Sequence, residues 1–461
     1  MPKNLPPTTH AESTLGLPIL RADSEEFPQF LKELKKKLSL QGEVTSTEGQ
    51  KKTKAIFGES LSPQEVVTKI CGDIKENGSK ALFDYSYKID GAKVDSQTIL
   101  VSQKELEEAH DQVETEYLET LRHITSNIET FQNALLCGDR LVSHIGAKLE
   151  HRYRPLRRVG LCVPGGAAAY PSSLLMTALP AKVAGVSEIA VMAPPTPYGA
   201  NNLYLRAACF ELGITELYRM GGTQGVASFA YGTKEIRKVD KIVGPGNLFV
   251  ALAKRHVYGE VDIDSIAGPS EVVILADSTA RASFLAADMI AQAEHSPGAS
   301  VLITWASELV EKIKEELGTQ LEALSRSELI LYSLNEYGAI VLVDNADEGC
   351  RLANTLAPEH LHVSTEKPRD LLPNLTSAGA LFLGHHTPVA VGDYYAGPSH
   401  VLPTSGTATW ASGLSANDFL RSYSVLEYSN DRLQRAAPYI QNLAEKEGLM
   451  GHWESVRKRI E

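Results

Sequence analysis

Histidine, glutamine and acidic residues recur in four short motifs of this chain, in types and spacings suited to metal binding and proton transfer. The first motif, Gln292-Ala-Glu-His295, lies at the end of a helix predicted to start near Thr279. Residues three apart share one face of a helix, so Gln292 and His295 can point to one centre. Imidazole is the commonest side-chain metal ligand, and a glutamine oxygen is a plausible donor to zinc or manganese. A Gln-x-x-His motif taken alone is nevertheless more often structural.

The second motif, Ala357-Pro-Glu-His-Leu361, places a carboxyl group and an imidazole side by side on a loop stiffened by proline. Histidine titrates near the operating pH of most enzymes, which suits His360 to the role of general base beside Glu359. The alternative interpretation is a capped loop with a surface carboxylate.

The third motif, Gly392-Asp-Tyr-Tyr-Ala-Gly-Pro-Ser-His400, offers Asp393 and His400 in a loop that glycine and proline stiffen. Such a loop loses little conformational entropy when it positions ligands. The tandem His385–His386 is a competing source of ligands, which we interpret as surface or structural. The fourth motif, Glu447-Gly-Leu-Met-Gly-His452, predicts nothing by itself.

Three glycine-rich turns each follow a predicted strand and precede a helix: Pro164-Gly-Gly166, Gly221-Gly-Thr-Gln224 and Gly244-Pro-Gly-Asn247. Ligands of open α/β sheets bind at the carboxyl ends of strands, and helix N-termini attract phosphates. None of the turns has the GxGxxG spacing of the usual dinucleotide fingerprint. The turns therefore indicate either a nucleotide site of another kind or purely structural turns.

Two series of short apolar strands, alternating with helices, must position these motifs. The first series covers 159–163, 188–193, 216–220 and 241–243, and the second covers 271–276, 300–304, 339–343 and 380–383. Alternating strands and helices are typical of parallel sheets. The predicted fold is α/β, with two parallel-sheet (Rossmann-like) domains and small helical N- and C-terminal arms. Before the first series, a capping box at Ser102 and Glu105 starts one long helix, whose apolar stripe runs from Leu106 to Phe131.

The bulk composition narrows the class of protein. A net charge of −12 argues against nucleic acid as a partner, and no apolar run is long enough for a membrane span. The N-terminus lacks the pattern of a secretory signal. Five cysteines without CxxC spacing favour a reduced, cytoplasmic protein with neither a disulfide framework nor a thiolate zinc site.

Considered together, the motifs resemble the histidinol dehydrogenase family, from about Leu61 to Arg459. The resemblance rests on VPGG, VDKIVGPGN, DIDSIAGPSEVVILAD, AADMIAQAEH, APEHL, VGDYYAGPSHVLPT and EGLMGH, in this order and at family-like separations. Any one of these stretches could arise by chance, whereas the ordered set is highly specific.

The resemblance implies an NAD-dependent, zinc-assisted oxidation of L-histidinol through L-histidinal to L-histidine, the last step of histidine biosynthesis. His360 would act as base and Glu359 would help to activate water. One Zn²⁺ per subunit would be held by Gln292, His295, Asp393 and, from the second subunit of a homodimer with shared active sites, His452. These ligands would also contact substrate, together with the set Ser270, His360, His400 and Glu447.

The resemblance also implies that Gln224 and Asn247 contact NAD. Cys162 stands where family members commonly carry a tyrosine that helps to bind NAD, which is a departure from the pattern at this cofactor position. The expected organisation is an N-terminal extension (1–55), a first α/β domain with the metal and catalytic residues (56–160 and 271–405), a second domain on the NAD side (161–270) and a helical tail that reaches the partner subunit (406–461).

Three other functions remain open on the sequence. A family relative that oxidises another small polyol, such as a sulfonated propanediol, would share the zinc site; Glu447 and His400 favour an imidazole and amine substrate instead. A zinc hydrolase could use the same metal donors and the Glu359–His360 pair to activate water, but the glycine turns favour a dehydrogenase. The presence of Glu359 and His360 argues against a non-catalytic paralogue.

Overall fold

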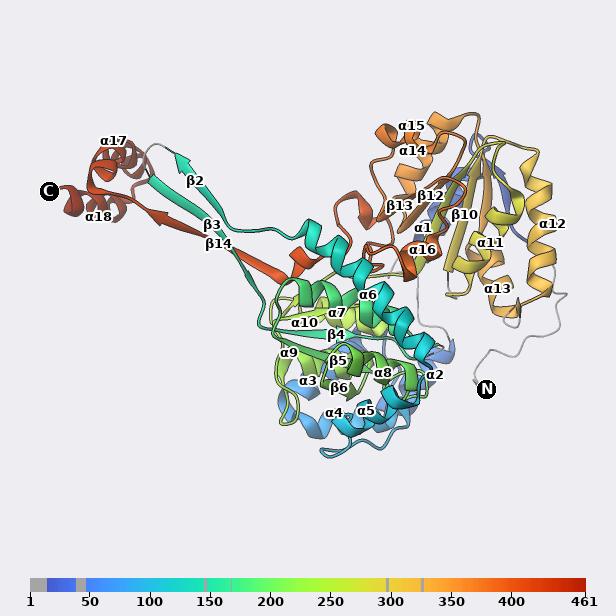
Figure 1. Cartoon of the computed structure of the whole chain (residues 1–461), viewed down its shortest axis with the longest axis horizontal. Helices are drawn as coiled ribbons and strands as arrows, with labels where there is room; N and C mark the ends of the chain where they lie inside the picture. The colour runs from blue at the N-terminus through green and yellow to red at the C-terminus, as the bar shows by residue number, and fades with distance from the viewer. Residues whose placement is uncertain (1–14, 39–46, 145–146, 167, 296–297, 325–326) are drawn as a thin grey trace.

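The computed structural model describes residues 15–38, 47–144, 147–166, 168–295, 298–324 and 327–461, which form two parallel sheets covered by helices and a projecting antiparallel arm (Figure 1). This architecture confirms the predicted α/β class with two parallel-sheet domains. Residues 1–14 and 39–46 of the predicted N-terminal extension lie outside the described residues. Nowhere in the described ranges is a helix both long and apolar enough to cross a membrane.

The larger sheet has six strands in the order β1-β11-β10-β9-β12-β13, all paired in parallel. Successive residues of a strand face opposite sides of the sheet. Val272 and Ile274 therefore pack beneath α11, α12 and α13, whereas Val273 and Leu275 pack beneath α1 and α14. The strands are β1 (Ile19–Arg21), β9 (Ser270–Ala276), β10 (Gly298–Thr304), β11 (Ala339–Leu342), β12 (His360–Ser364) and β13 (Ala380–Leu383).

Two strands of this sheet were absent from the prediction. β12 reads His-Leu-His-Val-Ser, in which two histidines interrupt the apolar run that marks a buried strand. β1 has only three residues. The helices of this unit are α1 (Phe27–Leu38), α11 (Ala282–Ala293), α12 (Leu309–Glu322), α13 (Ser327–Tyr337), α14 (Ala346–Leu356), α15 (Pro368–Leu371) and α16 (Val389–Tyr394), with a 3₁₀ turn, η1, at Leu372–Asn374.

The second parallel sheet has five strands in the order β6-β5-β4-β7-β8. Val159 and Leu161 of its central strand pack on one face with α6, α7 and α8, while Cys162 lies in the cluster on the other face with α3, α9 and α10. The strands are β4 (Arg158–Cys162), β5 (Glu188–Ala193), β6 (Glu216–Arg219), β7 (Lys241–Val243) and β8 (Asp262–Ile263). The helices are α3 (Pro63–Asn77), α4 (Ser79–Asp90), α7 (Pro171–Val183), α8 (Leu203–Glu211), α9 (Gly222–Tyr231) and α10 (Leu248–Val257).

The packing groups the chain differently from the predicted boundaries. Within the predicted N-terminal extension, β1 pairs with β11 and α1 packs on the six-stranded sheet, so this segment is part of that unit. The helices of residues 63–135 contact the five-stranded sheet, whereas the prediction grouped them with 271–405. The place of β1 and α1 could not be predicted from sequence order, because their partners on the six-stranded sheet lie far away in the chain.

The long helix predicted across 106–131 is two helices, α5 (Gln103–Gln112) and α6 (Thr115–Leu135). The capping box of Ser102 and Glu105 is present at the start of α5. The backbone is extended at Val113 and Glu114, which ends α5 and starts α6. The prediction of one helix was wrong because Leu106 and Ile128 belong to the same hydrophobic cluster although they lie on different helices.

Residues 140–155 and the C-terminal segment together form an arm that projects from the body of the molecule (Figure 1). An antiparallel sheet of β2 (Arg140–His144), β3 (Ala147–Pro155) and β14 (Leu420–Glu427) carries α17 (Asn430–Glu447) and α18 (Met450–Ile460) at its end. The tail predicted over 406–461 was helical, so β14 corrects it. β2 and β3 were not predicted; β3 is rich in charged side chains and shows no apolar pattern. The remaining elements are α2 (Thr47–Phe57), η2 (Thr407–Thr409) and η3 (Ala416–Phe419).

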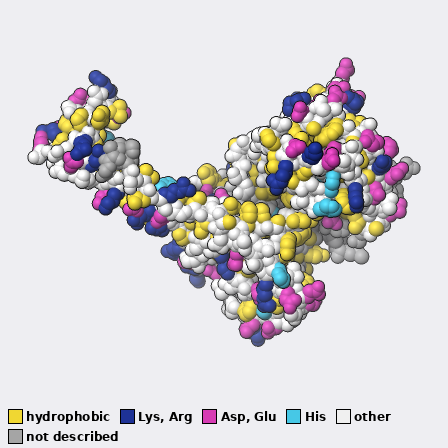
Figure 2. All heavy atoms as spheres, turned by 45° about the horizontal axis from the view of Figure 1, so that its top comes forward, with side chains coloured by type: hydrophobic (Ala, Val, Ile, Leu, Met, Phe, Trp, Pro, Cys, Tyr) yellow, Lys and Arg dark blue, Asp and Glu magenta, His cyan; other side chains and the backbone are white. Residues whose placement is uncertain are grey.

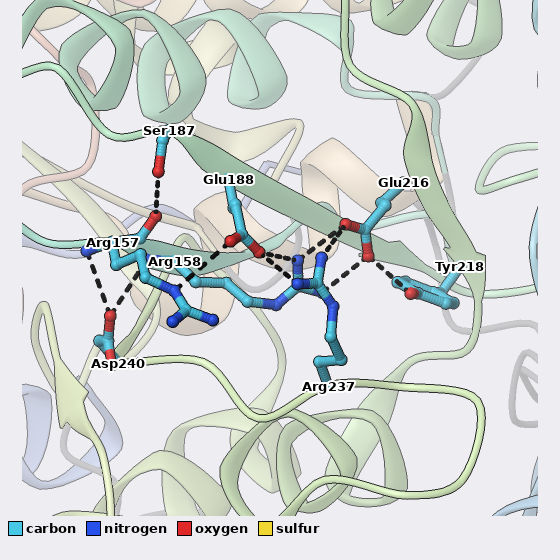
Figure 3. Close-up of polar contacts among 8 residues, drawn as sticks. All are labelled: Arg157, Arg158, Ser187, Glu188, Glu216, Tyr218, Arg237 and Asp240. Carbon is cyan, nitrogen blue, oxygen red and sulfur yellow. Dashed lines mark hydrogen bonds and ion pairs between the residues drawn. The ribbon is translucent and has the colours of Figure 1, made fainter.

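A network of charges closes the amino edge of the five-stranded sheet (Figure 3). The Arg158 guanidinium, whose side chain is 3% exposed, donates two hydrogen bonds of 2.7 Å to Glu216 and one of 3.2 Å to Glu188. Arg237 pairs with both carboxylates, and Tyr218 donates to Glu216. Burial raises the pKa of Glu216, but these donors and positive charges outweigh it and hold the pKa at about 2.

Candidate active site

The amino edge of the six-stranded sheet faces the carboxyl edge of the five-stranded sheet across one cavity. Ser270 begins β9 and His360 begins β12, so both lie at the amino edge of the six-stranded sheet. β7 ends at Val243, so the turn 244–247 lies at the carboxyl edge of the five-stranded sheet. A cavity of about 520 Å³ is lined from both edges, by the turn 244–247 and by Ser270, Glu359 and His360.

Glu359 is held by two donors from β9. Its Oε2 accepts a hydrogen bond of 2.6 Å from Ser270 Oγ and one of 3.1 Å from the Glu271 N–H. Burial raises the pKa of Glu359 to about 7, although both hydrogen bonds favour the ionised form. The carboxyl group can therefore take up or release a proton near neutral pH.

The backbone before Glu359 is also fixed. Ala357 ends α14 in the left-handed conformation, with φ 47°, which is uncommon for a residue other than glycine. The carbonyl groups of Pro358 and Glu359 accept hydrogen bonds from the N–H groups of Gly379 and Ala380. A side chain at Gly379 would come within 2.6 Å of the Glu359 carbonyl oxygen, so this contact needs glycine.

His360 lies between two carboxylates. Its Nε2 is 3.7 Å from Asp393 Oδ1 and its Nδ1 is 3.7 Å from Glu359 Oε2. Burial lowers the pKa of His360, an effect that the Asp393 charge partly offsets, so the neutral ring, which can accept a proton, is favoured. Within the described part of the chain, Nδ1 has no hydrogen-bond partner.

His400 is oriented by two neighbours. Its Nδ1 is 3.0 Å from the Asp393 carbonyl oxygen, which can only accept, so Nδ1 carries the proton. The other nitrogen, Nε2, lies 3.3 Å from the Ser173 hydroxyl, which then donates to it. Burial lowers the pKa of His400 to about 4. Sequence reasoning missed Ser173, although its place in the first turn of the helix after Pro164-Gly-Gly166 was a usable signal.

The three metal ligands predicted from one chain line a common cavity. A second cavity of about 560 Å³ is bounded by Gln292, His295 and Asp393, and it shares His295 and Asp393 with the first cavity. The spacing predicted that Gln292 and His295 share one face of a helix. This was wrong, because α11 ends at Ala293 and His295 follows the helix. In the described ranges, no three His, Cys, Asp or Glu side chains form a metal site by themselves. The predicted set instead combines an amide, an imidazole and a carboxylate with a ligand from another subunit.

The donor atoms are chemically suited to a divalent ion such as zinc. Gln292 Nε2 donates a 2.8 Å hydrogen bond to Ser270 Oγ, which leaves the amide oxygen available as a ligand. Burial raises the pKa of Asp393 to about 6 because it penalises the ionised carboxylate, and the nearby His360 offsets this penalty only in part. A cation beside this carboxylate would remove that penalty. Nitrogen and oxygen donors of this kind are typical of zinc and manganese sites.

Three positions were expected at the NAD site, namely Cys162, Gln224 and Asn247, and one of them lies at the cavity. Asn247 lines it and caps α10 by accepting a 3.2 Å hydrogen bond from the Val250 N–H. Cys162 is 2% exposed in the hydrophobic core and does not line the cavity. Gln224, which is 1% exposed, does not line it either and donates to Asp90 at 2.9 Å.

The remaining candidates lie elsewhere. Glu447 and His452 are exposed on the projecting arm, at the end of α17 and in α18, so one chain alone does not bring them to the cavity (Figure 1). His385 contacts Ser364 and Thr279 at the carboxyl edge of the six-stranded sheet. His385 is therefore on the opposite side of that sheet from the site, as its structural interpretation requires.

The fold and the site define an α/β enzyme in which the buried Glu359 and His360 line a cavity between two parallel-sheet domains. The sequence profile described as histidinol dehydrogenase matches residues 58–460. The histidinol dehydrogenase of Rhodopirellula baltica is 52% identical over 439 residues, 95% of each chain, and that of Clostridium acetobutylicum is 44% identical over 398 residues, 86% of this chain and 92% of the other. The chain belongs to the histidinol dehydrogenase family, a family of oxidoreductase enzymes.

A solved structure shows the same fold. The crystal structure of histidinol dehydrogenase from Elizabethkingia anophelis superposes with a TM-score of 0.83 at 32% identity, covering 89% of this chain and 95% of that chain. The family predicted from the motifs is therefore confirmed.

Proposed function

We propose that the protein oxidises L-histidinol through L-histidinal to L-histidine, the last step of histidine biosynthesis, with two molecules of NAD as hydride acceptors. The observation that carries this proposal is a single cavity between Glu359–His360 on one side and the Asn247 turn on the other. A base and a hydride acceptor must lie on either side of the same carbon for this chemistry. Family membership supplies the substrate class.

His360 performs the proton transfers in this proposal. Its buried ring is held neutral, so it takes the hydroxyl proton of the alcohol while hydride leaves the adjacent carbon. Glu359, with a pKa of about 7, then helps to remove a proton from the water that converts the aldehyde to its hydrate. His360 acts as base again in the second oxidation. Ser270 holds Glu359 in place and is itself held by Gln292.

Gln292, His295 and Asp393 would hold a zinc ion together with His452 of the partner subunit. Bound zinc would orient and polarise the amino alcohol. His400 lies beside Asp393 and contacts Ser173, and both His400 and Ser173 line the cavity on the proposed substrate side. Asn247 and the N-terminus of α10 bind NAD, since a helix N-terminus favours phosphate groups.

A homodimer with shared active sites explains the projecting arm. The arm exposes large apolar side chains, which Figure 2 shows on its surface. Leu141 is 63% exposed, Leu426 67%, Leu443 60% and Tyr439 80%. Exposed apolar patches of this kind are typical of interfaces. Docking of the arm on a second subunit would cover these side chains and bring its Glu447 and His452 to that subunit's cavity.

The ratio of NADH formed to histidinol consumed tests the proposal. We expect two NADH per histidinol, measured by the NADH absorbance and by chromatography of the products. One NADH per turnover with a sulfonated propanediol, and none with histidinol, would identify a family relative with another substrate. Absence of NADH with both compounds would favour the zinc hydrolase.

A further inference from the structure

Two oppositely charged side chains with little exposure to solvent lie behind the proposed cofactor turn. Lys254 of α10 and Asp264, which follows β8, form an ion pair in which the side chains are 2% and 4% exposed. Burying charges in this way is costly unless each charged group is well hydrogen-bonded. The partners of the two groups therefore show what the pair holds.

Both members of the pair contact Gly244. Lys254 Nζ donates a 3.1 Å hydrogen bond to the Gly244 carbonyl oxygen, and the Gly244 N–H donates a 2.6 Å hydrogen bond to Asp264 Oδ2. The other oxygen, Oδ1, accepts a 2.6 Å hydrogen bond from the Ser265 N–H. The ion pair thus fixes the N–H and the carbonyl of one residue at the same time.

Only glycine fits at position 244. Its φ of 108° lies in the region that favours glycine, and a Cβ atom there would lie 2.4 Å from the Cys162 carbonyl oxygen. The backbone of Gly244 is therefore packed against β4 on one side and clamped by Lys254 and Asp264 on the other. Cys162 therefore contacts the turn through its backbone, while its side chain packs in the core.

The clamped residue opens the turn that lines the cavity. Gly244, Gly246 and Asn247 all line it, and so does Asp264. Asn247, at the end of the turn, caps the first turn of α10, and Lys254 lies on the same helix. The ion pair therefore links α10 to Gly244 at the start of the turn. A shift of the Gly244 backbone would displace the groups that face a dinucleotide.

We propose that Lys254 and Asp264 are positioning residues that hold the turn 244–247 in the orientation that binds NAD. This inference rests on the proposed function, because it takes NAD as the ligand of the turn. The pair acts through the backbone of Gly244 and does not contact the reacting atoms.

The test is the NAD dissociation constant of Lys254→Met, measured by titration calorimetry on the metal-loaded full-length enzyme. We expect a rise of about tenfold or more, since small displacements of a binding group have effects of this size. The KM for histidinol and the zinc content should stay within twofold of the wild-type values. The control is Arg158→Met, which breaks a buried ion pair at the opposite edge of the same sheet.

If the control weakens NAD binding as much as Lys254→Met does, the pair is only a stabilising element and the inference fails. It also fails if a folded Lys254→Met protein binds NAD as the wild type does. Asp264→Asn, which is nearly isosteric, provides the same measurement if Lys254→Met does not fold; we expect a rise of a few fold, and an unchanged constant contradicts the inference. Failure of the wild-type protein to bind NAD would instead overturn the proposed function.

Discussion

The two parallel sheets contribute to the site in opposite ways. The five-stranded sheet uses its carboxyl edge, where the Gly244 turn presents backbone groups, and closes its amino edge with the Arg158–Glu216 network (Figure 3). The six-stranded sheet uses its amino edge, where His360 begins a strand, and its carboxyl edge carries the hydrogen bond between Ser364 and His385. In the proposed function, the Gly244 turn binds the cofactor, while side chains fixed at the starts of β9 and β12 carry out or support proton transfer.

Under the proposed function, the general rule for ligand binding to open sheets applies to only one of the two sheets. Ligands usually bind at the carboxyl ends of parallel strands. The five-stranded sheet follows this rule with the turn that starts at Gly244. The six-stranded sheet departs from it because the loop 357–359 precedes β12, which places Glu359 and His360 on the edge that faces the other sheet.

Replacing the proposed base should have the largest effect. His360→Asn removes the proton acceptor at the amino edge, and we expect kcat to fall by a factor of about 10² to 10⁴, the usual contribution of a general base. The assay is NADH formation at saturating histidinol and NAD, with zinc content as the control. A kcat within a few fold of the wild type would show that this edge does not carry the proton transfer.

The arm should contribute to the site of the other subunit. His452→Ala should lose zinc and activity, because the metal would lack one ligand; zinc is measured by mass spectrometry of the purified protein. Refolding an equal mixture of His452→Ala and His360→Asn chains should restore about a quarter of wild-type activity, since half of the dimers then contain one complete site. If the mixture stays inactive, or if His452→Ala retains its zinc, the arm does not complete the site.

Glu359 should matter more for one half-reaction than for the other. Glu359→Gln keeps the shape of the side chain but cannot take a proton from water. We expect oxidation of histidinal to slow by about 10²-fold more than oxidation of histidinol, the lower end of the usual contribution of one proton-transfer group. Each step is followed separately by NADH formation from the corresponding substrate. Equal slowing would remove the special role of Glu359.

The Arg158–Glu216 network at the amino edge of the five-stranded sheet should affect stability and leave catalysis unchanged. The pKa of Glu216 lies near 2, below its ordinary value of 4.5. The ionised carboxylate therefore stabilises the fold fully above pH 4.5, and this contribution is lost as the pH falls toward 2. Glu216→Gln should lower the free energy of unfolding by on the order of 2 kcal/mol at neutral pH, with the difference vanishing near pH 2, as urea titrations can measure. A constant difference across this range would contradict the argument.

Much of the fold could be predicted from local patterns. Short strands such as β5 and β13 are largely apolar runs, and the residues of both matched the prediction. β12 and the strands of the arm were missed because their histidine and charged residues hide the pattern. The packing of α1 on the six-stranded sheet could not be predicted, because it depends on contacts with residues hundreds of positions away.

The candidate site was predictable where a motif carries the chemistry. Glu359, His360 and Asp393 were proposed from such motifs and lie around one cavity. Ser173 was missed although its place at a helix start after a glycine turn was a usable signal, whereas a lysine in an apolar helix, such as Lys254, acquires meaning only from its partners. Glu447 and His452 are exposed in a single chain, so their role at the site depends on the proposed dimer.

The most direct test of the account compares NAD binding in two variants, one for each edge. Asn247→Ser keeps a side chain that can cap α10 but removes the amide from the cavity, whereas His360→Asn changes only the opposite edge. Titration calorimetry should show NAD binding weakened in Asn247→Ser and unchanged in His360→Asn. Equal affinity in both variants, or weaker binding in His360→Asn alone, would contradict the division of labour between the two sheets.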